Sequence, residues 1–139
     1  MSGLERVVVL LALIEKLCEV MARENDCVRR FALDPLSELQ AEKRTLAQAY
    51  EKELDRLRRE PELLGALPLE PRRQLEEAMR RMRAAARRNA EVLSAAKTVS
   101  ERLLRRLSEA LAEEPRHGAL ASGAAPRGRV IAMSVDRQV

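Results

Sequence analysis

The stretch that decides the fold is residues 71–114, PRRQLEEAMRRMRAAARRNAEVLSAAKTVSERLLRRLSEALAEE. Apolar and small side chains recur along it at alternating steps of three and four, which is the period of a helical heptad. These positions are Leu75, Met79, Met82, Ala86, Asn89, Leu93, Ala96, Ser100, Leu103, Leu107 and Ala110. The pattern predicts one long helix that Pro115 stops. Asn89 and Ser100 are its polar members, and we expect them to fix the register of helix packing at some cost in stability.

Residues 4–31 carry the pattern of the first helix along the chain. Ser2, with Glu5 three residues later, fits a capping box at its start. One apolar stripe comprises Leu4, Val7, Leu11, Ile14, Cys18, Met21, Asn25 and Val28, and a neighbouring stripe comprises Leu10, Leu13, Leu17, Val20, Cys27 and Phe31. Together they are wider than a two-stranded seam needs. We therefore expect this helix to pack against two others, or against one helix and a partner.

Residues 35–60, between these two segments, carry the pattern of the second helix along the chain. We expect Asp34 to be its N-cap and Pro35 to take its first helical position. Its apolar positions are Leu36, Leu39, Leu46, Tyr50, Leu54 and Leu57. The following prolines and glycine (Pro61, Gly65, Pro68 and Pro71) predict a hinge with room for a single turn around residues 62–66.

These patterns predict an all-α fold. We expect an elongated antiparallel three-helix bundle or coiled coil in residues 1–114, with a long third helix, followed by a flexible C-terminal tail in residues 115–139. The composition agrees, because the chain is 46% hydrophobic and 35% charged but has one Tyr, one Phe and no Trp. Narrow helical seams are filled by Leu, Val, Met and Ala rather than by aromatic volume.

The sequence offers no catalytic or cofactor chemistry. Its single histidine, His117, lies in a Gly/Ala-rich stretch without a nucleophile or carboxylate at a fixed spacing. It has no Gly-rich phosphate loop and no metal-ligand cluster, and Cys18 and Cys27 lie about 13 Å apart along a helix, too far for a disulfide. We interpret Glu24, at the edge of an apolar face, as a pairing residue. We therefore expect a protein that is not an enzyme and takes no cofactor, metal or small-molecule substrate.

The apolar run of residues 7–14 does not resemble a targeting segment. One basic residue precedes it, Glu15 and Lys16 follow at once, and the helical pattern continues without a cleavage site. Eight residues are too few to span a bilayer. We therefore expect a cytoplasmic protein without membrane insertion.

The length of the third helix leaves part of its apolar face unpaired. In an up, down, up arrangement it is about 65 Å long and its neighbours about 40 Å, so it outruns them near residue 97. The apolar residues beyond that point are Val99, Leu103, Leu104, Leu107 and Leu111, hereafter the apolar stripe. We predict that the stripe binds an amphipathic helix. Self-association, or folding of the tail over the stripe, is the alternative.

Four arginines form a basic patch on the outward side of the third helix: Arg80, Arg81, Arg87 and Arg88. We favour a solvated face here, because Glu76, Glu77 and Glu91 are interleaved with them. The alternative is docking to an acidic partner or to a phosphate backbone. The net charge of +4 permits nucleic-acid contact, but the chain lacks aromatic residues for base stacking, so we do not expect nucleic acid as the partner.

Several short elements resemble the FlgN-type flagellar export chaperones. The first helix is leucine-rich and ends in a Glu24-Asn25 turn, and the second carries Lys43-x-x-Leu46. The third helix carries Asn89 followed by Leu93 and small residues, and the chain ends in Ser-Val-Asp-Arg-Gln-Val. The resemblance covers the whole chain through diffuse motifs.

The resemblance implies a cytoplasmic chaperone for hook-filament junction proteins. Such a chaperone binds the C-terminal helical segment of its client, prevents premature assembly, and delivers the client to the export ATPase and export gate of the flagellar type III export apparatus. The apolar stripe would be the client site in a monomer. The apolar positions of the tail (Val130, Ile131, Met133 and Val135) would wrap the client or dock at the gate. The competing functions are a basic helical nucleic-acid-binding protein and another coiled-coil scaffold of the export apparatus.

Overall fold

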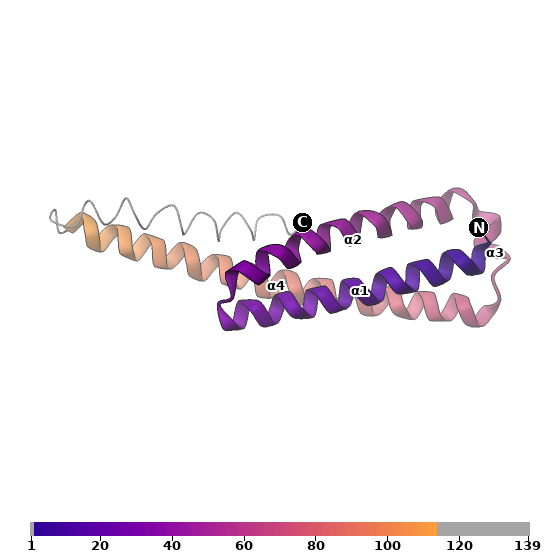
Figure 1. The fold of residues 1–139 in the computed structure, drawn as a ribbon, viewed down its shortest axis with the longest axis horizontal. Coiled ribbons are helices and arrows are strands. Elements are labelled where there is room, and N and C mark those ends of the chain that lie inside the picture. The colour runs from indigo at the N-terminus through magenta and orange to yellow at the C-terminus, as the bar shows by residue number, and fades with distance from the viewer. Residues whose placement is uncertain (1, 114–139) are drawn as a thin grey trace. The chain divides into compact units, whose positions relative to one another are not determined.

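The fold is all-α, as predicted. The computed structural model describes residues 2–113, which form α1 (Gly3–Arg30), α2 (Leu33–Arg59), the short α3 (Pro61–Gly65) and the long α4 (Leu69–Glu113), with no strand among them (Figure 1). The chain divides into two compact units, Met1–Asn89 and Ala90–Val139. The first contains α1, α2, α3 and the beginning of α4, and the second is described here through residues 90–113 of α4.

Both ends of α1 are closed by local hydrogen bonds. The predicted capping box is present: the backbone N–H of Glu5 donates to Ser2 Oγ at 3.2 Å, and the backbone N–H of Ser2 donates to Glu5 Oε2 at 3.1 Å. At the other end the N–H of Ala32 donates to the Cys27 carbonyl at 3.0 Å, and the N–H of Phe31 donates to the Val28 carbonyl at 3.3 Å. These two bonds form a Schellman motif.

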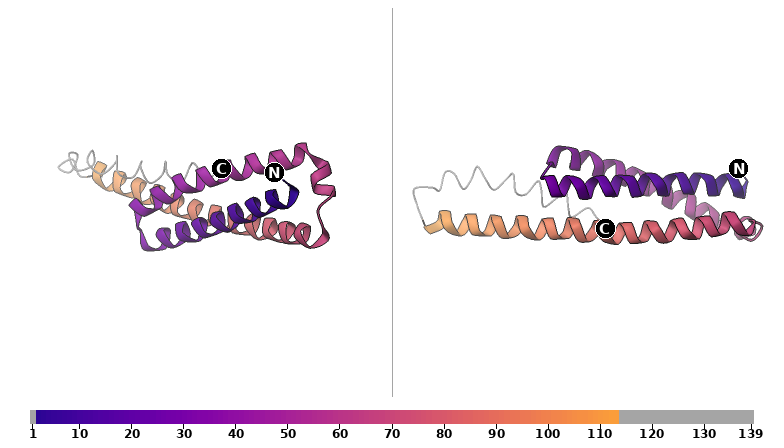
Figure 2. Two further views of the ribbon diagram at one scale, coloured as in Figure 1. Left: turned by 45° about the vertical axis from the view of Figure 1, so that its right-hand side comes forward. Right: turned by 90° about the horizontal axis from the view of Figure 1, so that it is seen from below.

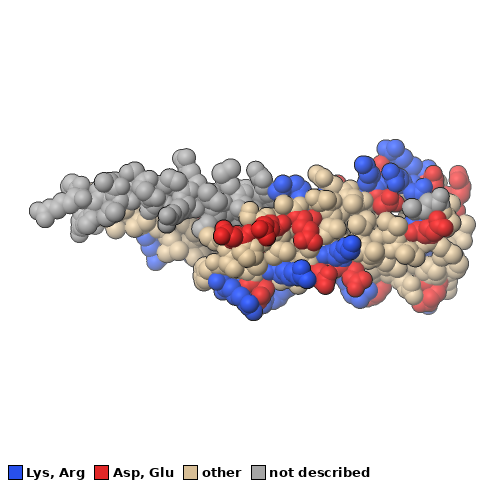
Figure 3. Space-filling model, viewed as in Figure 1, with Lys and Arg blue, Asp and Glu red and all other residues tan. Residues whose placement is uncertain are grey.

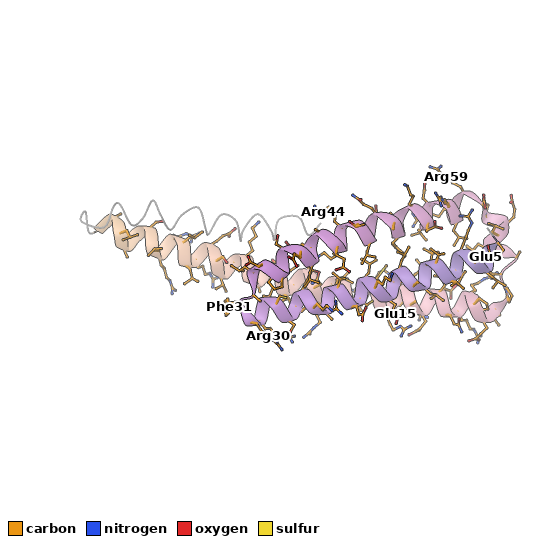
Figure 4. The ribbon with its side chains drawn as sticks, in the orientation of Figure 1. Glu5, Glu15, Arg30, Phe31, Arg44 and Arg59 are labelled. Atoms are coloured by element: carbon orange, nitrogen blue, oxygen red, sulfur yellow. The ribbon has the colours of Figure 1, made fainter. Side chains whose placement is uncertain are left out.

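Phe31 occupies the left-handed position of this motif, with φ 55° and ψ 34°. Glycine usually fills that position, because a Cβ there is strained. The sequence predicted Phe31 as part of an apolar face, and this is wrong: its side chain is 81% exposed at the turn between α1 and α2 (Figure 4). The helix ends at Arg30, and the reversal of the backbone removes Phe31 from the helical periodicity.

The Schellman turn also moves the start of α2. The N-cap is Ala32, without a side-chain hydrogen bond, so the prediction of Asp34 as N-cap is wrong. Because the turn uses only residues 31 and 32, the chain re-enters a helix at Leu33. Asp34 then lies in the first turn, where a carboxylate favours the helix dipole, and Pro35 lies where no N–H is needed.

The hinge contains one short helix, α3, with Pro61 at its first position. Arg72 Nη2 donates to the carbonyls of Leu64 at 3.0 Å and Gly65 at 3.2 Å, which ties α3 to the beginning of α4. The start of α1 also lies close to α3, since a Cβ built on Gly3 would be 3.3 Å from the Leu63 carbonyl oxygen.

The core of the first unit is centred on α1, which runs beside α2 and beside the N-terminal part of α4 (Figures 1 and 2). Its buried apolar side chains are Val7, Leu10, Ile14, Leu17 and Met21 from α1, Tyr50 and Leu57 from α2, Leu67 from the hinge, and Leu75 and Ala78 from α4. Arg6 of α1 lies 3.8 Å from Glu53 of α2 and 3.7 Å from Glu60, the C-cap of α2, so the beginning of α1 meets the end of α2. The wide apolar face of α1 thus serves two neighbours.

Candidate functional site

A buried polar cluster crosses the three long helices of the first unit. It consists of Glu24 and Asn25 on α1, Lys43 on α2 and Asn89 on α4, hereafter the polar cluster. Lys43 Nζ lies 2.9 Å from Glu24 Oε1 and donates to Asn89 Oδ1 at 3.0 Å. Asn89 Nδ2 donates to Asn25 Oδ1 at 2.9 Å and to the Met21 carbonyl at 3.3 Å. One amide therefore joins α4 to both other helices.

Burial shifts the proton affinities of the charged pair. Glu24 is 0% exposed, and burial raises the pKa of its carboxyl although hydrogen bonding and charge from Lys43 oppose the rise. Burial likewise lowers the pKa of the Lys43 ammonium, and Glu24 opposes that change. Each ion is therefore tolerated in the interior because the other is present.

The hydrogen bonds of the polar cluster fix the register in which α4 packs against α1 and α2. The polar cluster contains no cysteine, histidine or hydroxyl side chain, and among residues 2–113 no group of three or more His, Cys, Asp or Glu residues could hold a metal ion. Sliding α4 by one residue would withdraw Asn89 from Asn25 and Met21 and leave buried polar groups unpaired, which costs about 1–3 kcal/mol per group. The sequence had singled out Asn89 and Glu24, and it named Lys43 only as part of the Lys43-x-x-Leu46 element. The pairing of Lys43 with Glu24 could not be predicted, because it depends on which residues of α1 face α2.

The second unit carries the predicted apolar stripe. Within residues 90–113, Val99 is 50% exposed, Leu103 60% and Leu107 43%, whereas Leu104 and Leu111 are partly buried. Val99, Leu103 and Leu107 follow one another at steps of four, so they advance slowly around the same side of α4. Charged residues alternate with the stripe along the sequence. Between Val99 and Leu111 there are three arginines (Arg102, Arg105 and Arg106) and two glutamates (Glu101 and Glu109).

The predicted basic patch is exposed. Arg80, Arg81, Arg87 and Arg88 all reach solvent on α4, and Arg80 Nη2 lies 3.3 Å from Glu77 Oε2. The charge of Arg81 also reaches Cys18 on α1, where it partly offsets the rise in the thiol pKa that burial causes. The two cysteines are free, as their spacing predicted.

Two predicted features fall outside the described residues. The proposed docking positions Val130, Ile131, Met133 and Val135, and the single histidine His117, all lie beyond residue 113. Within the described helices none combines the length and apolarity that crossing a bilayer requires.

The chain was compared with known protein families, curated proteins and solved structures. No protein-family model, curated protein or solved structure matches this chain.

Proposed function

We propose that this protein is a cytoplasmic export chaperone whose apolar stripe binds the C-terminal helical segment of a flagellar hook-filament junction protein. The observation that carries the proposal is the exposure of Val99, Leu103 and Leu107 at helical spacing on α4. Large apolar side chains grouped on one helix face are a feature of protein–protein binding sites. The resemblance to FlgN-type chaperones supplies the class of client.

The expected mode of binding is helix against helix. An amphipathic client helix would lay its apolar face along the stripe, with anchors at steps of three and four that match those on α4. Fully burying one such side chain contributes about 1.5–3 kcal/mol. Each of the five side chains of the stripe is already partly covered in the free protein, so each contributes less than this to binding. After the entropy cost of association, a dissociation constant in the micromolar range is expected.

Binding of this kind explains the chaperone activity in physical terms. A client segment held on the stripe cannot use the same apolar face for assembly with other subunits, so premature assembly is prevented. The complex would then be delivered to the export ATPase and export gate, with the apolar positions of residues 130–135 as a second contact to the client or the gate.

The test is titration of a fluorescently labelled C-terminal peptide from a hook-filament junction protein against the purified full-length chain. Leu103→Glu and Leu107→Glu are expected to abolish saturable binding, because each places a carboxylate inside an apolar contact. Thr98→Glu is the matched control: it adds the same charge to the same exposed segment but lies on another side of α4. Circular dichroism confirms that each variant keeps its helices. Failure of the parent protein to bind at tens of micromolar, or equal loss in all three variants, would refute the proposed function.

The competing function is binding of nucleic acid through the basic patch. Arg81, Arg87 and Arg88 form no ion pair within residues 2–113, so they are available to a phosphate backbone. A duplex DNA titration at two salt concentrations discriminates the two functions. Tight binding that weakens steeply with salt and is lost in Arg87→Glu would favour nucleic acid over the chaperone.

A further inference from the structure

A pair of arginines borders the exposed part of the apolar stripe on α4. Val99, Leu103 and Leu107, hereafter the exposed row, are 50%, 60% and 43% exposed. Arg102 and Arg106, hereafter the arginine row, each precede one of these leucines, are four residues apart and are exposed. At 3.6 residues per turn the arginine row lies roughly 80° around the helix from the exposed row. A helix that lies on the exposed row therefore passes beside both guanidinium groups.

The other flank of the exposed row is apolar. Leu104 and Leu111 lie roughly 90° around the helix on that side, and both are partly buried. The two carboxylates between Val99 and Leu111 lie farther away, Glu109 at roughly 120° from the exposed row and Glu101 at roughly 160°. The exposed row is therefore bordered by arginine on one side and by leucine on the other.

The arginine row is not neutralised within the described part of the chain. Arg102 and Arg106 form no ion pair among residues 2–113. Both charges therefore remain available to a partner that covers the exposed row.

The end of α2 shows that basic side chains in this protein do not always have this setting. Figure 3 shows basic side chains gathered over the C-terminal part of α2. Arg56 there already lies 2.9 Å from Glu53. Arg59 lies 2.9 Å from Asp55, and Leu57 of the same turn is buried. Unpaired arginines beside exposed apolar side chains are thus a property of the stripe and not of this basic surface.

Charge argues against the chain itself as the occupant of the stripe. In an antiparallel pair of α4 helices like flanks face each other, so the arginine row of one copy would meet that of the other. In a parallel pair the arginine row would meet Leu104 and Leu111 of the second copy. Neither arrangement supplies a carboxylate. Residues 115–139 contain four arginines and one acidic residue, Asp136, so the tail is also a poor match for the arginine row.

We propose that the stripe selects an amphipathic helix of another protein that carries Asp or Glu four residues apart on one flank of its apolar face. This inference rests on the proposed function, because it names the chemistry of the client helix. The apolar face of the client would cover the exposed row, and its carboxylates would meet Arg102 and Arg106. Each exposed ion pair adds little affinity, so the arginine row acts mainly by rejecting helices with a basic flank.

The probe is a pair of designed helical peptides of about 18 residues, each long enough to cover residues 99–111. One peptide has leucines at helical spacing and glutamates on both flanks, so that carboxylates face the arginine row in either direction of binding. The other has lysine at every glutamate position. Fluorescence anisotropy is measured with the full-length chain at low and high salt. At low salt the glutamate peptide is expected to bind about tenfold more tightly than the lysine peptide, and at high salt the difference is expected to shrink.

Charge reversal of the protein locates the selectivity. Arg102→Glu/Arg106→Glu is expected to weaken the glutamate peptide about tenfold and to reverse the preference in favour of the lysine peptide. Arg87→Glu/Arg105→Glu is the matched control, since it makes the same change in net charge at exposed positions. Arg105 lies roughly 160° around the helix from the exposed row, and Arg87 lies in the first unit. The control is expected to keep the affinity within about twofold, and circular dichroism confirms that each variant keeps its helices.

The outcomes separate this inference from the proposed function. Equal binding of both peptides that Leu103→Glu/Leu107→Glu abolishes, or equal loss in the arginine-row and control variants, would overturn the selection of an acidic flank and leave the stripe as a client site. Binding that survives Leu103→Glu/Leu107→Glu would place the peptide elsewhere on the chain and overturn the inference. If the junction-protein peptide binds and neither designed peptide does, the stripe does not recognise an acidic flank; if none of the three binds, the proposed function fails as well. Sedimentation equilibrium adds one more: a dimer of the parent that Leu103→Glu/Leu107→Glu dissociates would assign the stripe to a second copy of this chain.

Discussion

Replacing Lys43 by methionine is the most informative single change in this protein. Methionine keeps most of the length of the side chain while removing the ammonium group that lies 2.9 Å from Glu24 Oε1 and 3.0 Å from Asn89 Oδ1. Glu24 is then left 0% exposed without its cationic partner, and Asn89 loses a donor. The free energy of unfolding should therefore fall steeply.

The size of the fall follows from the geometry. At 2.9 Å and an effective dielectric constant of about 20, the gross Coulomb attraction of the pair is about 6 kcal/mol. Desolvation of the two ions offsets a large part of this attraction, so the attraction itself is not the loss. Breaking a buried pair from one side typically costs about 3–5 kcal/mol, because one charge is left buried and uncompensated. We expect a loss in that range at pH 8.

The loss should depend on pH, with a sign fixed by Glu24. Its pKa is raised in the folded protein above the ordinary value of 4.5, and the loss of Lys43 raises it further. The folded state then binds more protons than the unfolded state between the ordinary and the raised pKa, so stability falls as pH rises through that window. The destabilisation by Lys43→Met should therefore be larger at pH 8 than at pH 4.5.

Urea unfolding followed by circular dichroism at both pH values measures this effect. Lys52→Met is the control, because Lys52 is an exposed lysine on the same helix, and its effect should stay within about 0.5 kcal/mol. Adding Glu24→Leu to Lys43→Met should recover most of the lost stability and remove the pH dependence. A loss below about 1 kcal/mol that is equal at both pH values would show that the pair is solvated and that the account of the polar cluster is incorrect.

Two further changes test the turn and the core. Phe31→Gly should raise the free energy of unfolding by about 1 kcal/mol, because glycine adopts the left-handed conformation at φ 55° without strain. The exposed Phe31 ring contributes little stability that could be lost. Phe31→Ala, which keeps the Cβ, should give no comparable gain in stability. Leu10→Ala should lower the free energy of unfolding by about 2–5 kcal/mol, since Leu10 is 0% exposed in the core. Val8→Ala, at a 65% exposed position, should change the free energy of unfolding by no more than about 0.5 kcal/mol. Both are read from urea unfolding, and equal effects of Leu10→Ala and Val8→Ala would contradict the assignment of the core face of α1.

The helices were predictable because their signals are local. The heptad spacing of residues 71–114 and the capping box at Ser2 and Glu5 depend only on residues within one or two turns, and the observed α4 and α1 begin and end within two residues of the predicted bounds. The turn after Arg30 was predicted wrongly, because the apolar character of Phe31 placed it on the helix face and the capping preference of Asp34 made it the N-cap. Phe31 is a poor choice for a left-handed residue, but two backbone hydrogen bonds hold it there.

The sequence by itself determined that this chain is all-α, with a wide apolar face on its first helix and an apolar stripe near the end of its last. Those properties are set by side-chain periodicity along one chain segment. Only the tertiary structure decided that Lys43 is the partner of Glu24 and that Asn89 joins α4 to both other helices. Each of these depends on which residues of separate helices face one another, and that register is fixed by packing between helices rather than by the period within any of them.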